Sequence, residues 1–169
     1  MQRTLVMIRH AKSSWANPLQ SDFERPLNKR GEHEAQEMGN LLKKMGLVPD
    51  LLICSKAKRT RQTAKRIADA VSYDKELIQK EEKLYHCISS VFDEVIFEID
   101  DSIQTVFIVA HNPGITEFVN YLSHEFKVME MPTCGIAAIQ FDADEWNQLP
   151  LADRKKLFFK QPDRSNVTA

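Results

Sequence analysis

The segment Thr4-Leu5-Val6-Met7-Ile8-Arg9-His10 begins with a short apolar run and ends on two side chains that can bind an anion. Short apolar runs without polar alternation are typical of strands buried in parallel sheets. The segment Thr105-Val106-Phe107-Ile108-Val109-Ala110 has the same character and is followed by His111. We therefore expect two buried parallel strands, each with a histidine at its carboxyl end.

The remainder of the chain alternates between strand and helix patterns. Further strands are expected at residues 50–54 and 135–141, with an edge strand at 156–160. Helices are expected at 28–45, 57–71, 88–99 and 112–122, where Asn28 and Asn112 act as caps and Pro113 is the first helical residue of the last one. This alternation predicts an α/β fold, a three-layer α/β/α sandwich with a mainly parallel central sheet. Ligands of such sheets bind outside the carboxyl ends of the strands.

Length and composition indicate one ordinary globular domain. The 169 residues suit a single domain, expected over residues 1–162 with a C-terminal tail at 163–169. With 23 Lys+Arg against 24 Asp+Glu the net charge is −1, which argues against non-specific nucleic-acid binding. No apolar run approaches the roughly 20 residues of a membrane helix, and the N-terminus lacks a signal-peptide pattern, so we expect no membrane partner.

The cysteines and glycines of the chain indicate its cellular compartment and the way in which it could bind a phosphate. The three cysteines are widely spaced and form no CxxC pair, which fits a reducing compartment, and we expect the cytoplasm. The five glycines are at least seven positions apart, so glycine-rich phosphate loops are absent. A phosphate would have to be held mainly by side chains.

The predicted strand ends bring together two arginines and two histidines. Arg9 and His10 follow the first strand, Arg59 follows Ser55 at the end of the second, and His111 follows the central one. Two guanidinium groups can neutralise a phosphoryl group without a metal or other cofactor, and a neutral imidazole is a nucleophile. The constellation predicts phosphoryl transfer through a phosphohistidine.

Several motifs resemble those of the histidine phosphatase superfamily. Arg9-His10-Ala11-Lys12-Ser13 resembles its Arg-His-Gly signature, with Ala11 in place of the glycine. The segments 55–64 and 109–112 resemble its second and third motifs, and 25–31 resembles a loop that its members share. The length and the Arg-Pro-Leu sequence favour the SixA-like branch, the protein phosphohistidine phosphatases. We expect the alanine to be tolerated unless its backbone requires a positive φ.

The resemblance implies roles for the catalytic set. His10 would attack phosphorus, while Arg9, Arg59 and a protonated His111 would hold the equatorial oxygens. It implies no metal and no cofactor. The further candidates for substrate binding or acid catalysis are Ser13, Arg25, Glu82 and Asn112.

The sequence allows more than one role for each of Arg25, Glu82 and His86. Arg25 could instead tie its loop to Asp22, and Glu82 is the nearest candidate for the acid that protonates a leaving group. His86, beside Tyr85, is a candidate for the wall of the pocket.

The leaving group decides the substrate class. An imidazole leaves more easily than an alkoxide, which needs a strong general acid. We therefore expect the partner to be a protein that carries phosphohistidine. The alternatives are a broad phosphomonoesterase that acts on small phosphate esters with Glu82 as its acid, and a module that binds phosphorylated partners without turnover.

A cysteine phosphatase is the remaining rival. That chemistry uses a Cys-x5-Arg loop, whereas Cys54 and Arg59 are one residue closer together, with no glycine between them. We expect Cys54 to be a small buried apolar residue. The basic residues in segment 55–66 are expected to form a solvated helix face whose positive field could steer an anionic substrate.

Overall fold

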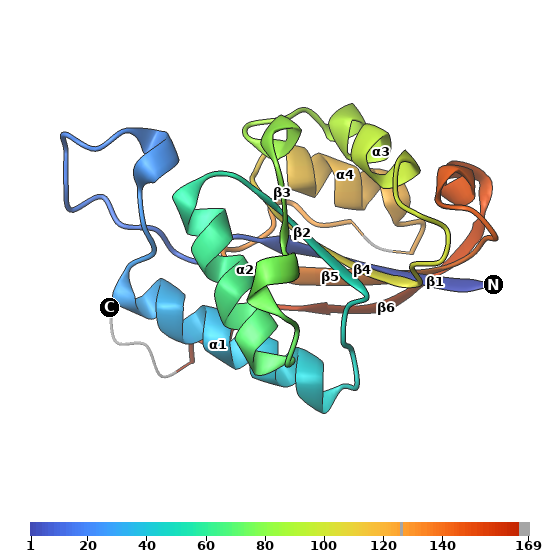
Figure 1. Cartoon of the computed structure of the whole chain (residues 1–169), viewed down its shortest axis with the longest axis horizontal. Coiled ribbons are helices and arrows are strands. Elements are labelled where there is room, and N and C mark those ends of the chain that lie inside the picture. The colour runs from blue at the N-terminus through green and yellow to red at the C-terminus, as the bar shows by residue number, and fades with distance from the viewer. Residues whose placement is uncertain (126, 166–169) are drawn as a thin grey trace.

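A six-stranded sheet forms the centre of the protein in the computed structural model, which describes residues 1–125 and 127–165 (Figure 1). The strands are β1 (Gln2–Arg9), β2 (Leu51–Ser55), β3 (Gln79–Glu81), β4 (Thr105–Ala110), β5 (Ile136–Asp142) and β6 (Asp153–Lys160). They lie in the order β3-β2-β4-β1-β5-β6, and the pairs from β3 to β1 are parallel. The pairs β1–β5 and β5–β6 are antiparallel. The sheet is thus mainly parallel, as predicted.

Helices cover both faces of this sheet. They are α1 (Lys29–Lys44), α2 (Lys58–Ala70), α3 (Ser89–Phe97) and α4 (Gly114–Leu122). Figure 1 shows α1 and α2 on one side of the strands and α3 and α4 on the other. Short 3₁₀ segments complete the fold at η1 (Asp22–Glu24), η2 (Lys75–Leu77), η3 (Glu82–Leu84) and η4 (Trp146–Leu151). The predicted three-layer arrangement is confirmed.

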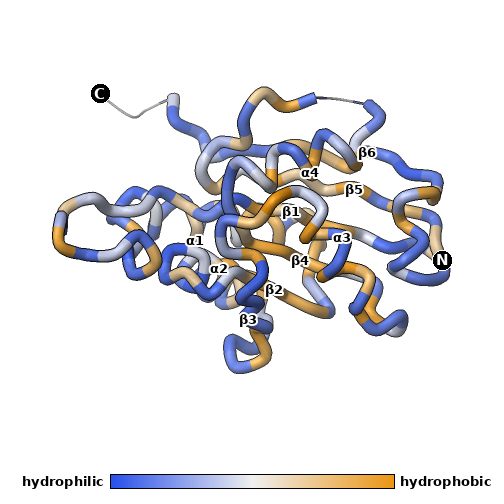
Figure 2. The backbone as a smooth tube through the Cα atoms, turned by 90° about the horizontal axis from the view of Figure 1, so that it is seen from above, coloured by the Kyte–Doolittle hydropathy of each residue, from blue (hydrophilic) through white to orange (hydrophobic). Residues whose placement is uncertain are grey.

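The side chains of β1 divide between two hydrophobic clusters. Leu5 and Met7 pack with α3 and α4, whereas Val6 and Ile8 pack with α1 and α2. All four are fully buried, and burial of such a side chain stabilises the fold by roughly 1.5–3 kcal/mol. Figure 2 shows the central strands β1 and β4 as mainly hydrophobic segments, whereas the edge strand β6 is largely hydrophilic. A strand that is apolar at every position is stable here because both of its faces are covered.

The predicted N-cap residue is confirmed for α1 and is wrong for α4. The Asn28 side chain accepts a hydrogen bond from the Gly31 amide and caps α1, as predicted. Asn112 does not cap α4, whose N-cap is Pro113 and whose first residue is Gly114. The Asn112 amide instead donates to the carbonyl of Met131 and accepts from Thr116. Tertiary partners therefore compete successfully with the local cap.

The two sheet edges differ from expectation. The edge strand β6 begins at Asp153, three residues before its predicted start. The short strand β3 was not predicted, because Gln79-Lys80-Glu81 has no apolar pattern and is a strand only through its pairing with β2.

Part of the predicted tail is anchored to the domain. The Arg164 guanidinium donates to both carboxylate oxygens of the buried Glu34 and to the hydroxyl and carbonyl oxygens of Thr133. A buried carboxylate is costly without a cation beside it, so Arg164 belongs to the folded domain. Residues 166–169 of the predicted tail lie outside the described residues. No helix among the described residues is long and apolar enough to cross a membrane.

Candidate active site

The carboxyl ends of β1, β2 and β4 bring the predicted strand-end residues together. The rings of His10 and His111 have centroids 5.3 Å apart, and Ser55 Oγ lies 2.8 Å from His111 Nε2. A cavity of about 270 Å³ opens at this point. Its lining includes every predicted site residue except Glu82, namely Arg9, His10, Ser13, Arg25, Arg59, His111 and Asn112.

His10 presents a neutral imidazole whose two nitrogens differ. Its Nδ1 lies 2.8 Å from the carbonyl oxygen of Ala11. Because a carbonyl can only accept, Nδ1 carries the proton and Nε2 keeps its lone pair. Burial lowers the pKa of His10 to about 3, against the hydrogen bond to Ala11, and the charges of Arg59 and Arg9 lower it further. At neutral pH the ring is therefore uncharged and keeps a lone pair on Nε2.

The loop after His10 is held by α1 and α2. The Ala11 amide donates to Thr63 Oγ1, and Thr63 Oγ1 donates to the carbonyl of Arg59. Ala11 is not among the residues with positive φ, so alanine fits where glycine was expected. Gly31 approaches the loop so closely that an added Cβ would lie 2.1 Å from the carbonyl oxygen of Lys12. Only glycine allows α1 to begin against this loop.

The surroundings of His111 disfavour the protonated form of its ring. Burial lowers its pKa to about 2, and the neighbouring His10, Arg59 and His86 lower it further. The Ser55 hydroxyl accepts a hydrogen bond from the Ala57 amide and lies 2.8 Å from His111 Nε2. The other ring nitrogen of His111, Nδ1, is buried without a hydrogen-bond partner among the described residues. An imidazole nitrogen with unused hydrogen-bonding capacity therefore lies beside His10.

The two predicted phosphate-binding arginines are held differently. Arg59 is almost fully buried and donates to the backbone carbonyl and the Oδ2 of Asp22, at 2.7 and 3.0 Å. Arg9 donates to the carbonyl of Met131 and lies 3.9 Å from Glu130. The Nε atom of each arginine is buried without a partner among the described residues. Both guanidinium groups thus line the cavity with hydrogen-bonding capacity unused.

Ser13 and Arg25 are tied to one another at the cavity wall. Arg25 NH1 donates to Ser13 Oγ at 2.5 Å, and Arg25 Nε and NH2 donate to Asp22 Oδ1. The guanidinium also lies over the ring of Trp15, 3.6 Å from its centroid. The alternative in which Arg25 ties its loop to Asp22 is therefore present, and Arg25 lines the cavity as well.

Asp22 is a part of the site that the sequence indicated only as a partner of Arg25. Its Oδ2 accepts from Arg59 and Tyr85 and lies 3.2 Å from His86 Nε2. His86 forms part of the cavity wall, as expected. The signal that could have identified Asp22 is its place three residues before Arg25, in a polar loop directly after the nucleophile strand.

Glu82 is not brought to the cavity. It lies in η3 with its side chain 85% exposed, and its nearest cation is Lys56 at 3.9 Å. Cys54 is also outside the cavity lining, and burial raises the pKa of its thiol to about 12. The thiol is therefore protonated at neutral pH, and it does not line the cavity that holds His10. Across the described ranges, no group of three or more His, Cys, Asp or Glu side chains could hold a metal ion.

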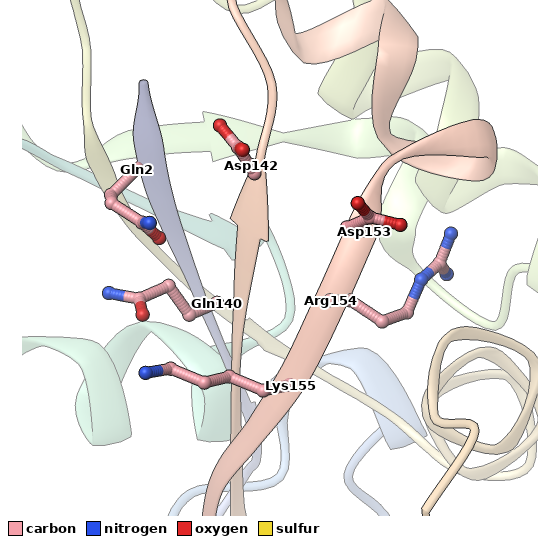
Figure 3. Close-up of a pocket in the computed structure, with 6 residues that line it drawn as sticks. All are labelled: Gln2, Gln140, Asp142, Asp153, Arg154 and Lys155. Carbon is pink, nitrogen blue, oxygen red and sulfur yellow. The ribbon is translucent and has the colours of Figure 1, made fainter.

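A second depression lies at the opposite end of the sheet. It has a volume of about 230 Å³ and is formed by side chains of β1, β5 and β6 (Figure 3). Its lining residues are Gln2, Gln140, Asp142, Asp153, Arg154 and Lys155. With neither a histidine nor a cysteine and with balanced charges, it offers no nucleophile for phosphoryl transfer. Of these two cavities, the strand-end cavity is the one that combines histidines with arginines.

The chain is similar to known proteins in sequence and in fold. Residues 5–87 match the model of the histidine phosphatase superfamily (branch 1). A protein of Agrobacterium tumefaciens that carries the name SixA is 27% identical, with a TM-score of 0.78 over 94% of this chain and 98% of that chain.

Two further solved structures share the fold. A SixA-named protein of Nakamurella multipartitia is 23% identical and has a TM-score of 0.82 over 96% of this chain and 97% of that one. A protein histidine phosphatase SixA in complex with tungstate is 20% identical, with a TM-score of 0.75 over 96% and 97% of the two chains. With the motifs at its strand ends, the chain belongs to the histidine phosphatase superfamily, and it is similar to SixA-named members of it.

Proposed function

We propose that this protein is a phosphatase that removes the phosphoryl group from phosphohistidine on a partner protein, through a phosphorylated His10. The observation that carries the proposal is the hydrogen bond from His10 Nδ1 to Ala11, which leaves the Nε2 lone pair in a cavity lined by Arg9 and Arg59. The fold and superfamily agree with phosphatase activity through a histidine.

The mechanism follows from the groups around the cavity. His10 Nε2 attacks phosphorus, and the bond from phosphorus to the leaving group breaks. Arg9, Arg59 and the Nδ1–H of His111 stabilise the negative charge on the equatorial oxygens. Bringing in a dianionic phosphoryl group raises the proton affinity of His111 relative to the empty site. Water then hydrolyses phospho-His10, without a metal cofactor.

The position of Glu82 favours phosphohistidine over phosphate esters. An alkoxide leaving group needs a proton donor in the cavity, and this exposed carboxyl is paired with Lys56 outside it. The protein histidine phosphatase SixA with tungstate, a tetrahedral oxyanion, is a relative of the same fold. The cytoplasm remains the proposed compartment, in keeping with the three free cysteines.

The test is a side-by-side assay on a phosphohistidine protein and on phosphate esters, with and without EDTA. We expect faster turnover of phosphohistidine and no effect of EDTA. Rapid alkaline quench with a radiolabelled phosphoryl donor should trap an adduct that is stable in alkali, is lost on later treatment with acid, and is absent from His10→Ala. Activity that survives in His10→Ala and disappears in Cys54→Ser would overturn the mechanism, and tight binding without any adduct would indicate a binding module.

A further inference from the structure

An imidazole ring already lies against the carboxylate of Asp22 beside the cavity. His86 Nε2 is 3.2 Å from Asp22 Oδ2, and its ring stacks on Tyr85 with centroids 4.1 Å apart and planes 22° from parallel. The Tyr85 hydroxyl donates to the same carboxylate oxygen at 2.6 Å. The Tyr85 ring offers a flat aromatic surface, and the Asp22 carboxylate offers an anionic acceptor. A single ring can contact both, so the two side chains form a site that fits an imidazole.

This place adjoins the groups that would hold the phosphoryl group. Asp22 Oδ2 accepts from Arg59 NH2 at 3.0 Å, and the same guanidinium nitrogen is 3.5 Å from His86 Nε2. The ring centroids of His86 and His111 are 5.6 Å apart. An imidazole bound here is therefore next to the phosphoryl position.

The Asp22 carboxylate can accept a hydrogen bond but cannot supply a proton. Burial acts to raise the pKa of Asp22, yet hydrogen bonds from Tyr85 and Arg25 and the charge of Arg59 hold it well below its usual range. Asp22 is thus ionised at neutral pH. Its Oδ2 already has three neighbouring donors, and His86, whose side chain is 55% exposed, is the one most easily displaced.

We propose that Asp22 and Tyr85 form a subsite for the leaving imidazole of the substrate, and that His86 occupies this subsite when no substrate is bound. The inference rests on the proposed phosphohistidine phosphatase activity and assigns to it a specificity-determining pair. The side chain of His86 swings out, and the substrate ring takes its place on Tyr85.

The proton and electron balance of the step is simple. The substrate ring carries phosphorus on one nitrogen and a proton, taken from solvent, on the other. His10 Nε2 attacks, the P–N bond breaks, and its electron pair stays on the leaving nitrogen. The ring departs as neutral imidazole with its N–H still donated to Asp22. An ester oxygen would gain nothing from Asp22, because an ionised carboxylate has no proton to give to an alkoxide.

Binding of free imidazole tests the subsite without any use of catalysis. We expect His86→Ala to bind imidazole at least roughly fivefold more tightly than the wild type, because the internal competitor is gone. His86→Gly serves as a second variant, since glycine readily adopts the φ of 51° found at this position. Chemical-shift titration is the readout, and Asp22→Asn added to either variant should abolish the gain.

A matched control is His33→Ala, which removes an exposed imidazole that pairs with Glu37 on α1. It should bind imidazole as the wild type does. Equal affinity of all variants would overturn the subsite while leaving the phosphatase proposal intact. Loss of phosphohistidine turnover in both His86 variants, with no gain in imidazole binding, would instead make His86 a proton donor and contradict the proposal.

Substrate preference is the second test. Asp22→Asn should lower the ratio of kcat/KM for a phosphohistidine peptide to kcat/KM for p-nitrophenyl phosphate by about 10- to 100-fold, the effect of losing a charge-assisted hydrogen bond. Tyr85→Phe keeps the stacking ring and should lower it less, and Asp69→Asn, an exposed carboxylate on α2, should not change it. An unchanged ratio in folded Asp22→Asn would overturn the subsite. Wild-type protein without phosphohistidine turnover would overturn the proposed function itself.

Discussion

The ends of β1 and β4 lie side by side in the sheet and carry the same residue type, yet their imidazoles are hydrogen-bonded through opposite nitrogens. His10 is held at Nδ1 by the carbonyl of Ala11, whereas His111 is held at Nε2 by the hydroxyl of Ser55. Both rings are buried and neutral because burial and nearby positive charge lower the pKa of each. Two residues of the same type thus leave different ring nitrogens free, Nε2 in His10 and Nδ1 in His111, and the proposed function gives these nitrogens different roles.

Removal of the nucleophile should have the largest effect. His10→Ala should lower turnover of phosphohistidine by roughly 10⁴-fold or more and abolish the phosphoenzyme, because no other group can take its place in the reaction. Single-turnover kinetics with alkaline quench measures both quantities. A phosphoenzyme of normal amount in this variant would show that the two imidazoles have exchanged roles.

Removal of the second imidazole should be less severe. His111→Asn keeps a donor but loses the ring, and we expect turnover to decrease by about 10²- to 10³-fold, the usual effect of losing one donor to developing charge. The phosphoenzyme should still form, more slowly, and should be visible by the same quench. A complete absence of adduct would mean that His111, and not His10, accepts the phosphoryl group.

Both histidines should make the protein sensitive to acid. Their folded-state pKa values, about 3 and about 2, are below the ordinary 6.5, so the unfolded chain binds more protons below pH 6.5. The free energy of unfolding should therefore be greatest above this pH and decrease as pH falls. Between pH 7.5 and 5 each ring should account for roughly 1–2 kcal/mol.

Urea unfolding at several pH values measures this loss. His10→Asn and His111→Asn should each remove about half of the pH dependence in that interval. His33→Asn, which removes an exposed ring on α1, should leave it unchanged. An unchanged slope in the two active-site variants would show that neither ring is forced to stay neutral by folding.

Loss of the group that orients His111 should have a smaller effect. Ser55→Ala removes the hydroxyl at 2.8 Å from Nε2 and frees the ring to place its proton on either nitrogen. We expect kcat to decrease by about 2- to 10-fold, in proportion to one neutral hydrogen bond, with recovery in Ser55→Thr. A change in KM without a change in kcat would indicate that Ser55 acts in substrate binding rather than in orienting the His111 ring.

The smallest effect should come from Glu82. Its exposed carboxyl lies outside the cavity that holds both imidazoles, so Glu82→Gln should change turnover of any substrate by less than about twofold. Steady-state assays on phosphohistidine and on sugar phosphates provide the measurement. A selective loss on sugar phosphates would establish the alternative phosphomonoesterase, with Glu82 as its acid.

The architecture and the central residues of the site could be predicted because they depend on local patterns. Apolar runs long enough for a strand, ending in Arg9-His10 and in His111, indicate buried parallel strands whose carboxyl ends meet. The polar strand β3 and the displaced cap at Asn112 could not be predicted in this way, since each depends on a partner distant in the sequence.

The sequence by itself determined which side chains gather at the strand ends, because hydrophobic period and strand direction place them there. Only the tertiary structure decided what each of them can do. The contact of His111 with Ser55, the low pKa of His111 and the placement of Asp22 against Arg59 and His86 arise from contacts between residues far apart in the chain. Proton position and charge depend on burial and on neighbours, and these exist only once the chain has folded.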